Sequence, residues 1–180
     1  MRIIGGIHGG RKFHPPARIP ARPTTDFAKE GLFNTLNNMI SFEGLKTLDI
    51  FAGTGSISYE LASRGATDLT LIERDRTTVQ FINKTMEELK FDGFKILQMN
   101  VFKFLNNCVE SYDFIFAGPP YALKEIDKIP DIIFDKKLLN PEGIFILEHT
   151  PRNDYQEHPQ FLKMKNYGTT IFTYFTWNNN

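Results

Sequence analysis

The sequence predicts an α/β fold organised around a mostly parallel sheet of seven strands. Between residues 45 and 148, short apolar runs alternate with segments whose apolar residues recur at helical spacing. A glycine-rich turn at residues 52–55 follows the first apolar run, and two strand-like runs close the chain. Strands that alternate with helices form right-handed units in which helices cover both faces of a parallel sheet. The final pair of runs predicts an antiparallel hairpin.

Each element of this fold is assigned from its own apolar pattern. The expected strands are residues 45–51, 69–73, 94–99, 112–117 and 143–148, and the closing hairpin pairs 161–165 with 170–177 across Asn166-Tyr167-Gly168. The expected helices are residues 56–64, 77–90, 101–108 and 126–139, the last interrupted by Pro130. A further helix should begin after Pro23 with Asp26 as its N-cap. Residues 2–4 and 12–13 can pair as a short hairpin.

Composition narrows the class of protein. The 180 residues suit one domain, and 41% hydrophobic with 23% charged residues is typical of a globular protein. No apolar run approaches the roughly 20 residues that span a bilayer, and residues 1–10 lack the apolar core of a secretory signal. The single cysteine, Cys108, excludes an intrachain disulfide. These features predict a cytoplasmic protein.

Charge is unevenly distributed along the chain, although the formal net charge is zero. Residues 1–25 hold five basic residues and no acidic one, so the remainder has 16 basic and 21 acidic residues. We therefore divide the chain into a basic arm (1–24), a main domain (25–177) and a tail (178–180). The arm could bind a phosphate backbone. The charge distribution alone is equally compatible with a solvated terminal segment that binds nothing.

A glycine-rich loop follows the first core strand and precedes a helix. It reads Asp49-Ile50-Phe51-Ala52-Gly53-Thr54-Gly55. Glycines there let the backbone turn tightly and approach a ligand next to a helix N-terminus. Many nucleotide-binding proteins share such a loop, so alone it is weakly diagnostic. A dinucleotide fingerprint wants a further glycine where this chain has Ser58, which argues against that class.

Polar residues at neighbouring strand ends sharpen the interpretation. Glu73 ends the second strand, where an acid accepts hydrogen bonds from ribose hydroxyls. Asp49 would face the ammonium group of S-adenosylmethionine, whereas it would repel a pyrophosphate. Asn100 ends the third strand and could contact an adenine or cap the next helix. Together with the closing hairpin, these features predict the Rossmann-like fold of class I S-adenosylmethionine-dependent methyltransferases.

The loop after the fourth strand reads Gly118-Pro119-Pro120-Tyr121. It resembles the Asp/Asn-Pro-Pro-Tyr/Phe loop of methyltransferases that modify exocyclic amino groups of bases or a side-chain amide. Such an amine is a poor nucleophile because its lone pair is delocalised, and acceptors aimed at its N–H groups localise that pair. In those enzymes the acceptors are the Asp or Asn side chain and a proline-loop carbonyl, here expected from Pro119. Tyr121 would stack on the extruded base.

Gly118 lacks the acceptor side chain of that loop. The loss of one preorganised polar group in a catalytic site typically lowers the rate by about 10²- to 10³-fold. The glycine can therefore mark a weakened enzyme, or another group can supply the acceptor.

The chain as a whole resembles the RsmD family, bacterial methyltransferases that modify guanine N2 in small-subunit ribosomal RNA. The likeness covers about residues 1–150. The residues that carry it are Arg2-Ile3-Ile4-Gly5-Gly6, Gly10-Arg11-Lys12, Arg22-Pro23-Thr24-Thr25-Asp26, Glu30, Leu32-Phe33-Asn34, Asp49, Phe51-Ala52-Gly53, Gly55, Glu73, Asp75, Pro119-Pro120-Tyr121 and Glu148. Gly118 stands where the family has Asp, and Phe27 and Lys29 stand where many members have arginines.

The resemblance implies roles for particular residues. The cofactor S-adenosylmethionine would be held by Asp49, Phe51, Ala52, Gly53, Gly55, Glu73, Asp75 and Asn100. The base would be presented by Gly118, Pro119, Pro120 and Tyr121. The basic residues Arg2, Arg11, Lys12, Arg18 and Arg22 would approach rRNA, within a ribosomal subunit or an assembly intermediate, and we expect the protein to act as a monomer.

Other residues receive structural interpretations. The four histidines and Cys108 lack the spacing of metal ligands, so no metal site is expected. Glu148 and His149 are read as a surface pair at a strand end, with a substrate role as the lesser possibility. The aromatic residues Phe172, Tyr174, Phe175 and Trp177 are expected to pack on an edge strand rather than to stack on bases.

Transfer of a methyl group to guanine N2 in small-subunit rRNA is therefore the expected function. An adenine N6 or protein-amide methyltransferase uses similar loop chemistry and stays open. A non-catalytic rRNA-binding or assembly protein also stays open, because of Gly118. A dinucleotide-dependent oxidoreductase is the weakest alternative.

Overall fold

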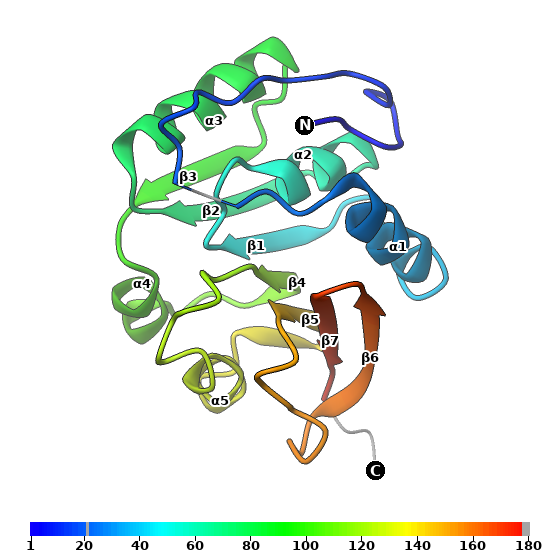
Figure 1. The fold of residues 1–180 in the computed structure, drawn as a ribbon, viewed down its shortest axis with the longest axis vertical. Helices are drawn as coiled ribbons and strands as arrows, with labels where there is room; N and C mark the ends of the chain where they lie inside the picture. Colours follow the sequence, from blue (N-terminus) through cyan, green and yellow to red (C-terminus); the bar gives the residue numbers. More distant parts are fainter. Residues whose placement is uncertain (21, 178–180) are drawn as a thin grey trace.

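The computed structural model describes residues 1–20 and 22–177 and confirms the predicted architecture (Figure 1). Seven strands form one sheet in the order β3-β2-β1-β4-β5-β7-β6. The strands are β1 (Lys46–Ile50), β2 (Asp68–Glu73), β3 (Phe94–Gln98), β4 (Tyr112–Ala117), β5 (Leu139–His149), β6 (Phe161–Tyr167) and β7 (Thr170–Phe175). The helices are α1 (Asp26–Leu36), α2 (Ser56–Ser63), α3 (Arg76–Glu88), α4 (Val101–Asn107) and α5 (Lys128–Asp135). The predicted tail at residues 178–180 lies outside the described residues.

The first five strands are parallel, and β7 enters antiparallel between β5 and β6. The closing hairpin is confirmed, but its turn is shorter than predicted. Tyr167 pairs with Thr170, which leaves the two-residue loop Gly168-Thr169 with Gly168 at a φ of 69°. Because β7 lies inside the sheet, its aromatic residues are buried core residues and not the edge-strand residues that we predicted.

The predicted helix at 126–139 is wrong at both ends. α5 begins at Lys128, so Pro130 falls in its first turn, where a missing N–H is tolerated, and does not interrupt the helix. Leu139 belongs to β5, which is longer than the predicted strand at 143–148. The register between β4 and β5 shifts after Leu139 and resumes at Ile144, so Pro141 occupies the irregular part of the strand.

The start of α1 also differs from the prediction. Thr25, not Asp26, is the N-cap, and its hydroxyl accepts a hydrogen bond from the Ala28 backbone N–H at 3.2 Å. Asp26 occupies the first turn, where its charge suits the helix dipole, and pairs with Arg2 at 3.4 Å. The side chain of Arg2 is thereby drawn to α1.

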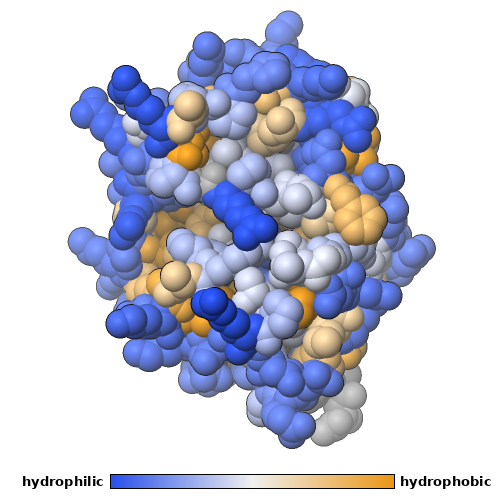
Figure 2. Space-filling model, in the orientation of Figure 1, coloured by the Kyte–Doolittle hydropathy of each residue, from blue (hydrophilic) through white to orange (hydrophobic). Residues whose placement is uncertain are grey.

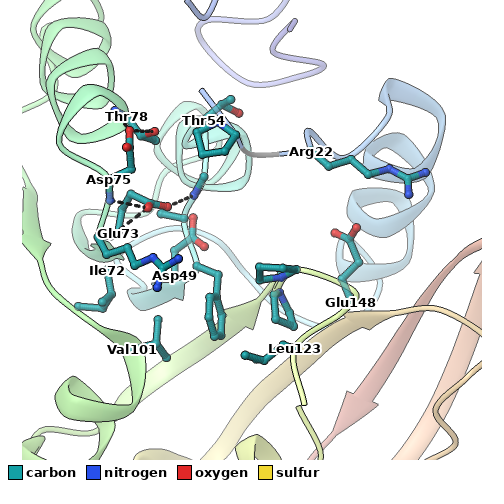
Figure 3. Close-up of a pocket in the computed structure, with 18 of the residues that line it drawn as sticks. Arg22, Asp49, Thr54, Ile72, Glu73, Asp75, Thr78, Val101, Leu123 and Glu148 are labelled. Atoms are coloured by element: carbon teal, nitrogen blue, oxygen red, sulfur yellow. Dashed lines mark hydrogen bonds between the residues drawn. The ribbon is translucent and has the colours of Figure 1, made fainter. Parts of the chain in front are cut away.

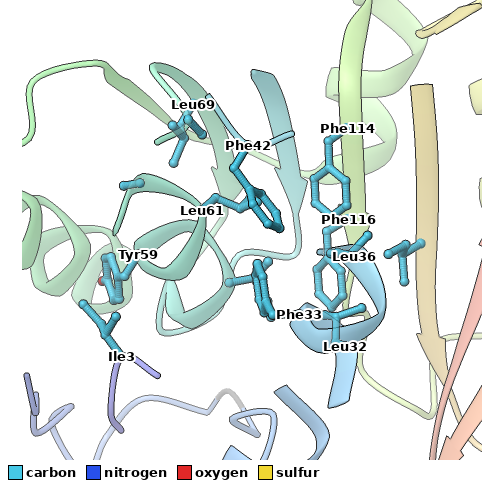
Figure 4. Packing of buried hydrophobic residues seen from close by; sticks show 14 of the residues in the cluster. Ile3, Leu32, Phe33, Leu36, Phe42, Tyr59, Leu61, Leu69, Phe114 and Phe116 are labelled. Atoms are coloured by element: carbon cyan, nitrogen blue, oxygen red, sulfur yellow. The ribbon is translucent and has the colours of Figure 1, made fainter. Parts of the chain in front are cut away.

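The N-terminal segment packs against the main domain. Arg2 and Lys12 form an antiparallel bridge, so the predicted pairing is confirmed, and the Ile3 N–H donates to the Arg11 carbonyl at 2.9 Å. Ile3 and Phe13 are buried in the same hydrophobic cluster as Tyr59 of α2. Figure 4 shows Ile3 against Tyr59, and the α1 side chains Leu32, Phe33 and Leu36 beside Phe116 of β4.

The buried carboxylate of Glu60 in α2 ties this segment to two helices. It accepts hydrogen bonds from the backbone N–H groups of Ile4 and Gly5 at 2.9 and 2.8 Å and pairs with Arg64 at 2.9 Å. The fully buried ammonium of Lys29 in α1 lies 3.6 Å away and donates to the Ser56 hydroxyl. Burial lowers the Lys29 pKa, and the Glu60 charge opposes that shift. Glu60 therefore compensates the buried charge of Lys29.

Hydrophilic side chains cover most of the face shown in Figure 2. Phe27 is 70% exposed and meets the Tyr167 ring edge-on at 5.6 Å. Among the described residues, no helix is long and apolar enough to cross a membrane.

Glu60→Ala should lower the free energy of unfolding by about 3–5 kcal/mol, because it leaves the Lys29 ammonium buried without its counter-charge. Urea unfolding of both proteins measures the change. Glu87→Ala, at an exposed position of α3, is the matched control and should stay within about 0.5 kcal/mol of the parent. Equal effects of the two substitutions would contradict a structural role for Glu60.

Candidate active site

A cavity of about 1000 Å³ opens at the carboxyl ends of the parallel strands. The loops after β1, β2, β3 and β4 line it, together with the end of β5 and residues 20 and 22–24. Figure 3 shows Glu73 and Asp75 on one side, Arg22 and Glu148 on the other, and the apolar side chains of Ile72, Val101 and Leu123 along the lower edge of the view. Doubly wound sheets bind their ligands at this edge.

Most of the predicted site residues meet in this cavity. Those that line it are Asp49, Phe51, Ala52, Gly53, Glu73, Asp75, Asn100, Gly118, Pro119, Pro120, Tyr121 and Arg22. The predicted residues outside its lining are Gly55, Arg2, Arg11, Lys12 and Arg18.

The glycine loop has the backbone conformation that its sequence requires. Gly53 and Gly55 have φ angles of 56° and 83°, and Phe51 is also at a positive φ of 60°. Gly55 is the N-cap of α2, and a Cβ there would lie 2.6 Å from the Tyr59 ring. Gly55 therefore serves the turn and the packing of α2 rather than the cavity wall.

Asp49 is a fully buried carboxylate that lines the cavity. The Ser58 hydroxyl donates to it at 2.7 Å, so the serine that departs from the dinucleotide fingerprint positions this acid. Burial raises the pKa of Asp49 to about 7, against the effect of the Ser58 hydrogen bond, and the charges of Glu73 and Glu148 add to the rise. Within the described residues, Asp49 forms no ion pair, so the arrangement suits a cationic ligand group.

Glu73 holds the adjoining loops together. Its carboxylate accepts backbone hydrogen bonds from Gly53 at 3.0 Å, Arg74 at 2.8 Å and Asp75 at 2.9 Å. Since each carboxylate oxygen has two lone pairs, acceptor capacity remains for a ligand in the cavity.

Two further predicted cofactor residues are helix caps. Asp75 accepts hydrogen bonds from the Thr78 backbone and hydroxyl, which lower the pKa of Asp75. Asn100 caps α4 through its side-chain oxygen, which accepts from the Lys103 N–H at 3.1 Å. The prediction that Asn100 caps the next helix is thus confirmed. Both residues line the cavity, so capping and contact with a ligand are compatible.

The Pro-Pro-Tyr loop begins where β4 ends. The Gly118 N–H donates to the Ile50 carbonyl at 3.4 Å, which links this loop to the end of β1. The guanidinium carbon of Arg22 lies 4.9 Å from the centroid of the Tyr121 ring. One face of the ring that should stack on a base is therefore covered by a cation.

Glu148 and His149 are buried at 7% and 1% exposure, so the predicted surface pair is wrong. Glu148 accepts hydrogen bonds from the Thr24 hydroxyl at 2.8 Å and the Tyr121 hydroxyl at 3.0 Å. Burial raises the Glu148 pKa, and its two hydrogen bonds oppose the rise. His149 contacts the Thr173 hydroxyl at 2.7 Å. The position of Glu148 at the ligand-binding end of a strand was the sequence signal for a site residue.

Four of the five basic side chains of the arm lie outside the cavity lining, and they differ in their surroundings. Arg2 pairs with Asp26, and Arg11 donates to the Glu88 carbonyl at 3.3 Å. Lys12 and Arg18 are exposed. Arg22 alone among the five predicted RNA-binding residues reaches the cavity.

The strand order, the closing hairpin and the cavity define a class I methyltransferase fold. The structure superimposes with a TM-score of 0.85 on yhhF from Escherichia coli, described as a candidate methyltransferase, at 29% identity over 97% of this chain and 96% of that one. SMU.776, a further candidate methyltransferase, was solved in complex with S-adenosylhomocysteine (SAH). It shares the fold at 17% identity, with a TM-score of 0.66 over 82% of this chain and 49% of that one.

The family model described as "Conserved hypothetical protein 95" matches residues 1–176, and the chain belongs to this family, the RsmD family. Among its relatives is "Ribosomal RNA small subunit methyltransferase D" of Escherichia coli strain K12, which is 33% identical over 85% of this chain and 76% of that protein.

Asp49→Asn should stabilise the ligand-free protein increasingly as the pH rises from 4 to 7. The folded-state pKa of about 7 lies above the ordinary value of 3.8, so ionisation of Asp49 opposes folding throughout that interval. The gain should reach on the order of 4 kcal/mol and level off above pH 7. Urea unfolding of both proteins at pH 5, 6, 7 and 8 measures it. A difference that does not vary with pH would contradict the assignment.

Proposed function

We propose that the chain transfers a methyl group from S-adenosylmethionine to the exocyclic N2 amino group of a guanine in small-subunit rRNA. One observation carries this proposal. The glycine loop with Asp49 and the Pro-Pro-Tyr loop with Tyr121 line a single cavity, so a cofactor and an amine substrate can meet there. Membership of the RsmD family supports the choice of substrate.

The residues on one side of the cavity fit the proposed cofactor. Asp49 would hold the ammonium group, since it is a buried acid without an ion-pair partner in the described chain. Glu73 would accept hydrogen bonds from the ribose hydroxyls, and Gly53 lets the backbone approach the ligand. Ile72 and Val101 offer an apolar surface for the adenine, beside Asn100. When bound, the cofactor supplies an electrophilic methyl group on sulfur.

The residues on the other side would present the target base. The Pro119 carbonyl would accept a hydrogen bond from the amino group and help to localise its lone pair toward the methyl group. Tyr121 would stack on the base, a contact worth about 1–3 kcal/mol. Because Arg22 covers one face of Tyr121, the base either displaces the guanidinium or uses the other face. Positioning and electrostatics then supply most of the acceleration.

RNA would reach the cavity along the N-terminal segment. Arg22 lies at the cavity, and the exposed Lys12 and Arg18 can approach phosphates, with Arg2 and Arg11 exchanging their internal partners for RNA. This assigns residues 1–24 to RNA binding and residues 25–177 to catalysis. We propose that the protein acts as a cytoplasmic monomer on rRNA within a subunit or assembly intermediate.

A second candidate function follows from Gly118. A chain that has lost turnover but still binds rRNA would act as a binding or assembly factor. Adenine N6 or a protein amide is the alternative target for an active enzyme, because that chemistry uses a similar loop.

Small ribosomal subunits that lack the modification should accept labelled methyl groups from S-adenosylmethionine when the protein is added. Digestion of the rRNA to nucleosides should place the label in N2-methylguanosine. Label in N6-methyladenosine would replace the guanine assignment. Binding of the subunits without any transfer would favour the assembly factor.

The affinity for SAH should fall about tenfold between pH 8 and pH 6. The ligand's ammonium group requires ionised Asp49, and the free protein has an Asp49 pKa of about 7, so each pH unit below 7 weakens binding up to tenfold. Calorimetric titration at the two pH values measures the change. Asp49→Asn is the control, and its weaker affinity should vary less than twofold with pH. An equally pH-dependent variant would assign the effect to another group.

A further inference from the structure

The carboxylate of Glu148 lies beside the place where Gly118 lacks a side chain. Ala117 of β4 pairs with Leu147 of β5. Gly118 and Glu148 are the next residues after this pair, so they lie side by side at the ends of adjacent strands. A Cβ built on Gly118 would lie 3.7 Å from Glu148 Oε2. An aspartate at position 118 would therefore start its side chain next to a carboxylate that is already present.

The surroundings of Glu148 hold that carboxylate in place without exhausting its capacity. Thr24 donates to Oε2 at 2.8 Å, and Tyr121 donates to Oε1 at 3.0 Å. Each oxygen keeps a second lone pair for a further donor. The two donors come from the N-terminal segment and the Pro-Pro-Tyr loop, the parts of the chain proposed to contact the RNA and the base. Glu148 also lines the cavity.

We propose that Glu148 is a catalytic residue that accepts a hydrogen bond from the substrate amino group, in place of the acceptor missing at Gly118. The inference rests on the proposed methylation of an exocyclic amine. The Pro119 carbonyl and the Glu148 carboxylate would then engage the two N–H groups of the amine.

The chemical step balances with these groups. The amine lone pair forms the new N–C bond while the C–S bond of the sulfonium breaks, and the pair of electrons from that bond stays on sulfur. The methylated nitrogen then carries one proton too many, and it releases that proton to the Glu148 carboxylate, which passes it to solvent. No further reactant is needed.

The alternative role for Glu148 is structural, because its two hydrogen bonds link Thr24 to Tyr121. Glu148→Gln separates the two roles, because an amide keeps the size of the side chain and an oxygen that can accept from a hydroxyl. It loses one acceptor oxygen and the negative charge. Gly118→Asp is structurally tolerable, since its Cβ would come within 3.1 Å of a Phe116 ring carbon and needs a shift of a few tenths of an ångström.

The experiment compares four proteins on subunits that lack the modification: the parent, Gly118→Asp, Glu148→Gln and the double variant. Methyl transfer at saturating substrate gives kcat, SAH titration reports the cofactor site, and thermal unfolding at pH 8 reports stability. Glu142→Gln, at an exposed position of β5, is the matched control and should resemble the parent in all three.

We expect Glu148→Gln to lower kcat about 10²- to 10³-fold with SAH affinity unchanged. Gly118→Asp should raise kcat at least tenfold in the Glu148→Gln background, and its effect on kcat should be smaller when Glu148 is intact. The substitution Gly118→Asp should destabilise the parent more than it destabilises the Glu148→Gln variant, because two carboxylates share one space only in the parent background.

Three results would overturn the inference and leave the proposed function standing. The first is a Glu148→Gln kcat within about threefold of the parent. The second is a gain in kcat from Gly118→Asp that is as large with Glu148 intact as in the Glu148→Gln background, which would mean that the parent lacks an acceptor. The third is loss of SAH binding in Glu148→Gln, which assigns the residue a structural role. Absence of transfer by every protein overturns the proposed function as well, whereas transfer by the parent with an unaffected Glu148→Gln overturns the Glu148 inference alone.

Discussion

The pairing of β1 with β4 at the centre of the sheet is the constraint on which the rest of the site depends. From β1 the chain adds β2 and β3 on one side of the sheet, and from β4 it adds β5 on the other side. The loops that leave β1 and β4 must therefore diverge, and the space between them is the cavity. The hydrogen bond from Gly118 to the Ile50 carbonyl fixes their separation at the point of divergence.

Much of the fold could be predicted because the local patterns agree with the global one. Strands buried on both faces read as apolar runs, and the helices between them show periodic apolar faces, so the order and type of the elements are correct. The errors fall where two local rules compete. Pro130 can break a helix or start one, and Leu139 follows apolar residues at helical spacing although it pairs with Tyr112 in the sheet. Sheet pairing decides such cases, and it is not a local property.

The candidate site was predictable where its residues lie at the carboxyl ends of strands, as Asp49 and Glu73 do, or in the loop that follows one, as Tyr121 does. Glu148 has the same kind of position, but one of its two hydrogen-bond donors is Thr24, which is 124 positions away along the chain. The partners of Asp49 and Lys29 were likewise invisible, because Ser58 and Glu60 read as ordinary helix residues. Contacts between distant segments decide whether a polar side chain is solvated or directed into a cavity.

The N-terminal segment is fastened largely through its main chain. Glu60 receives the N–H groups of Ile4 and Gly5, the Ser63 hydroxyl donates to the Gly5 carbonyl at 2.6 Å, and Lys29 donates to the carbonyl of Arg2. Every residue type except proline offers those backbone groups. The contacts that hold the segment on the domain are thus separate from the side chains that it exposes. Those exposed side chains can change from one sequence to another while the path of the segment across α2 stays fixed.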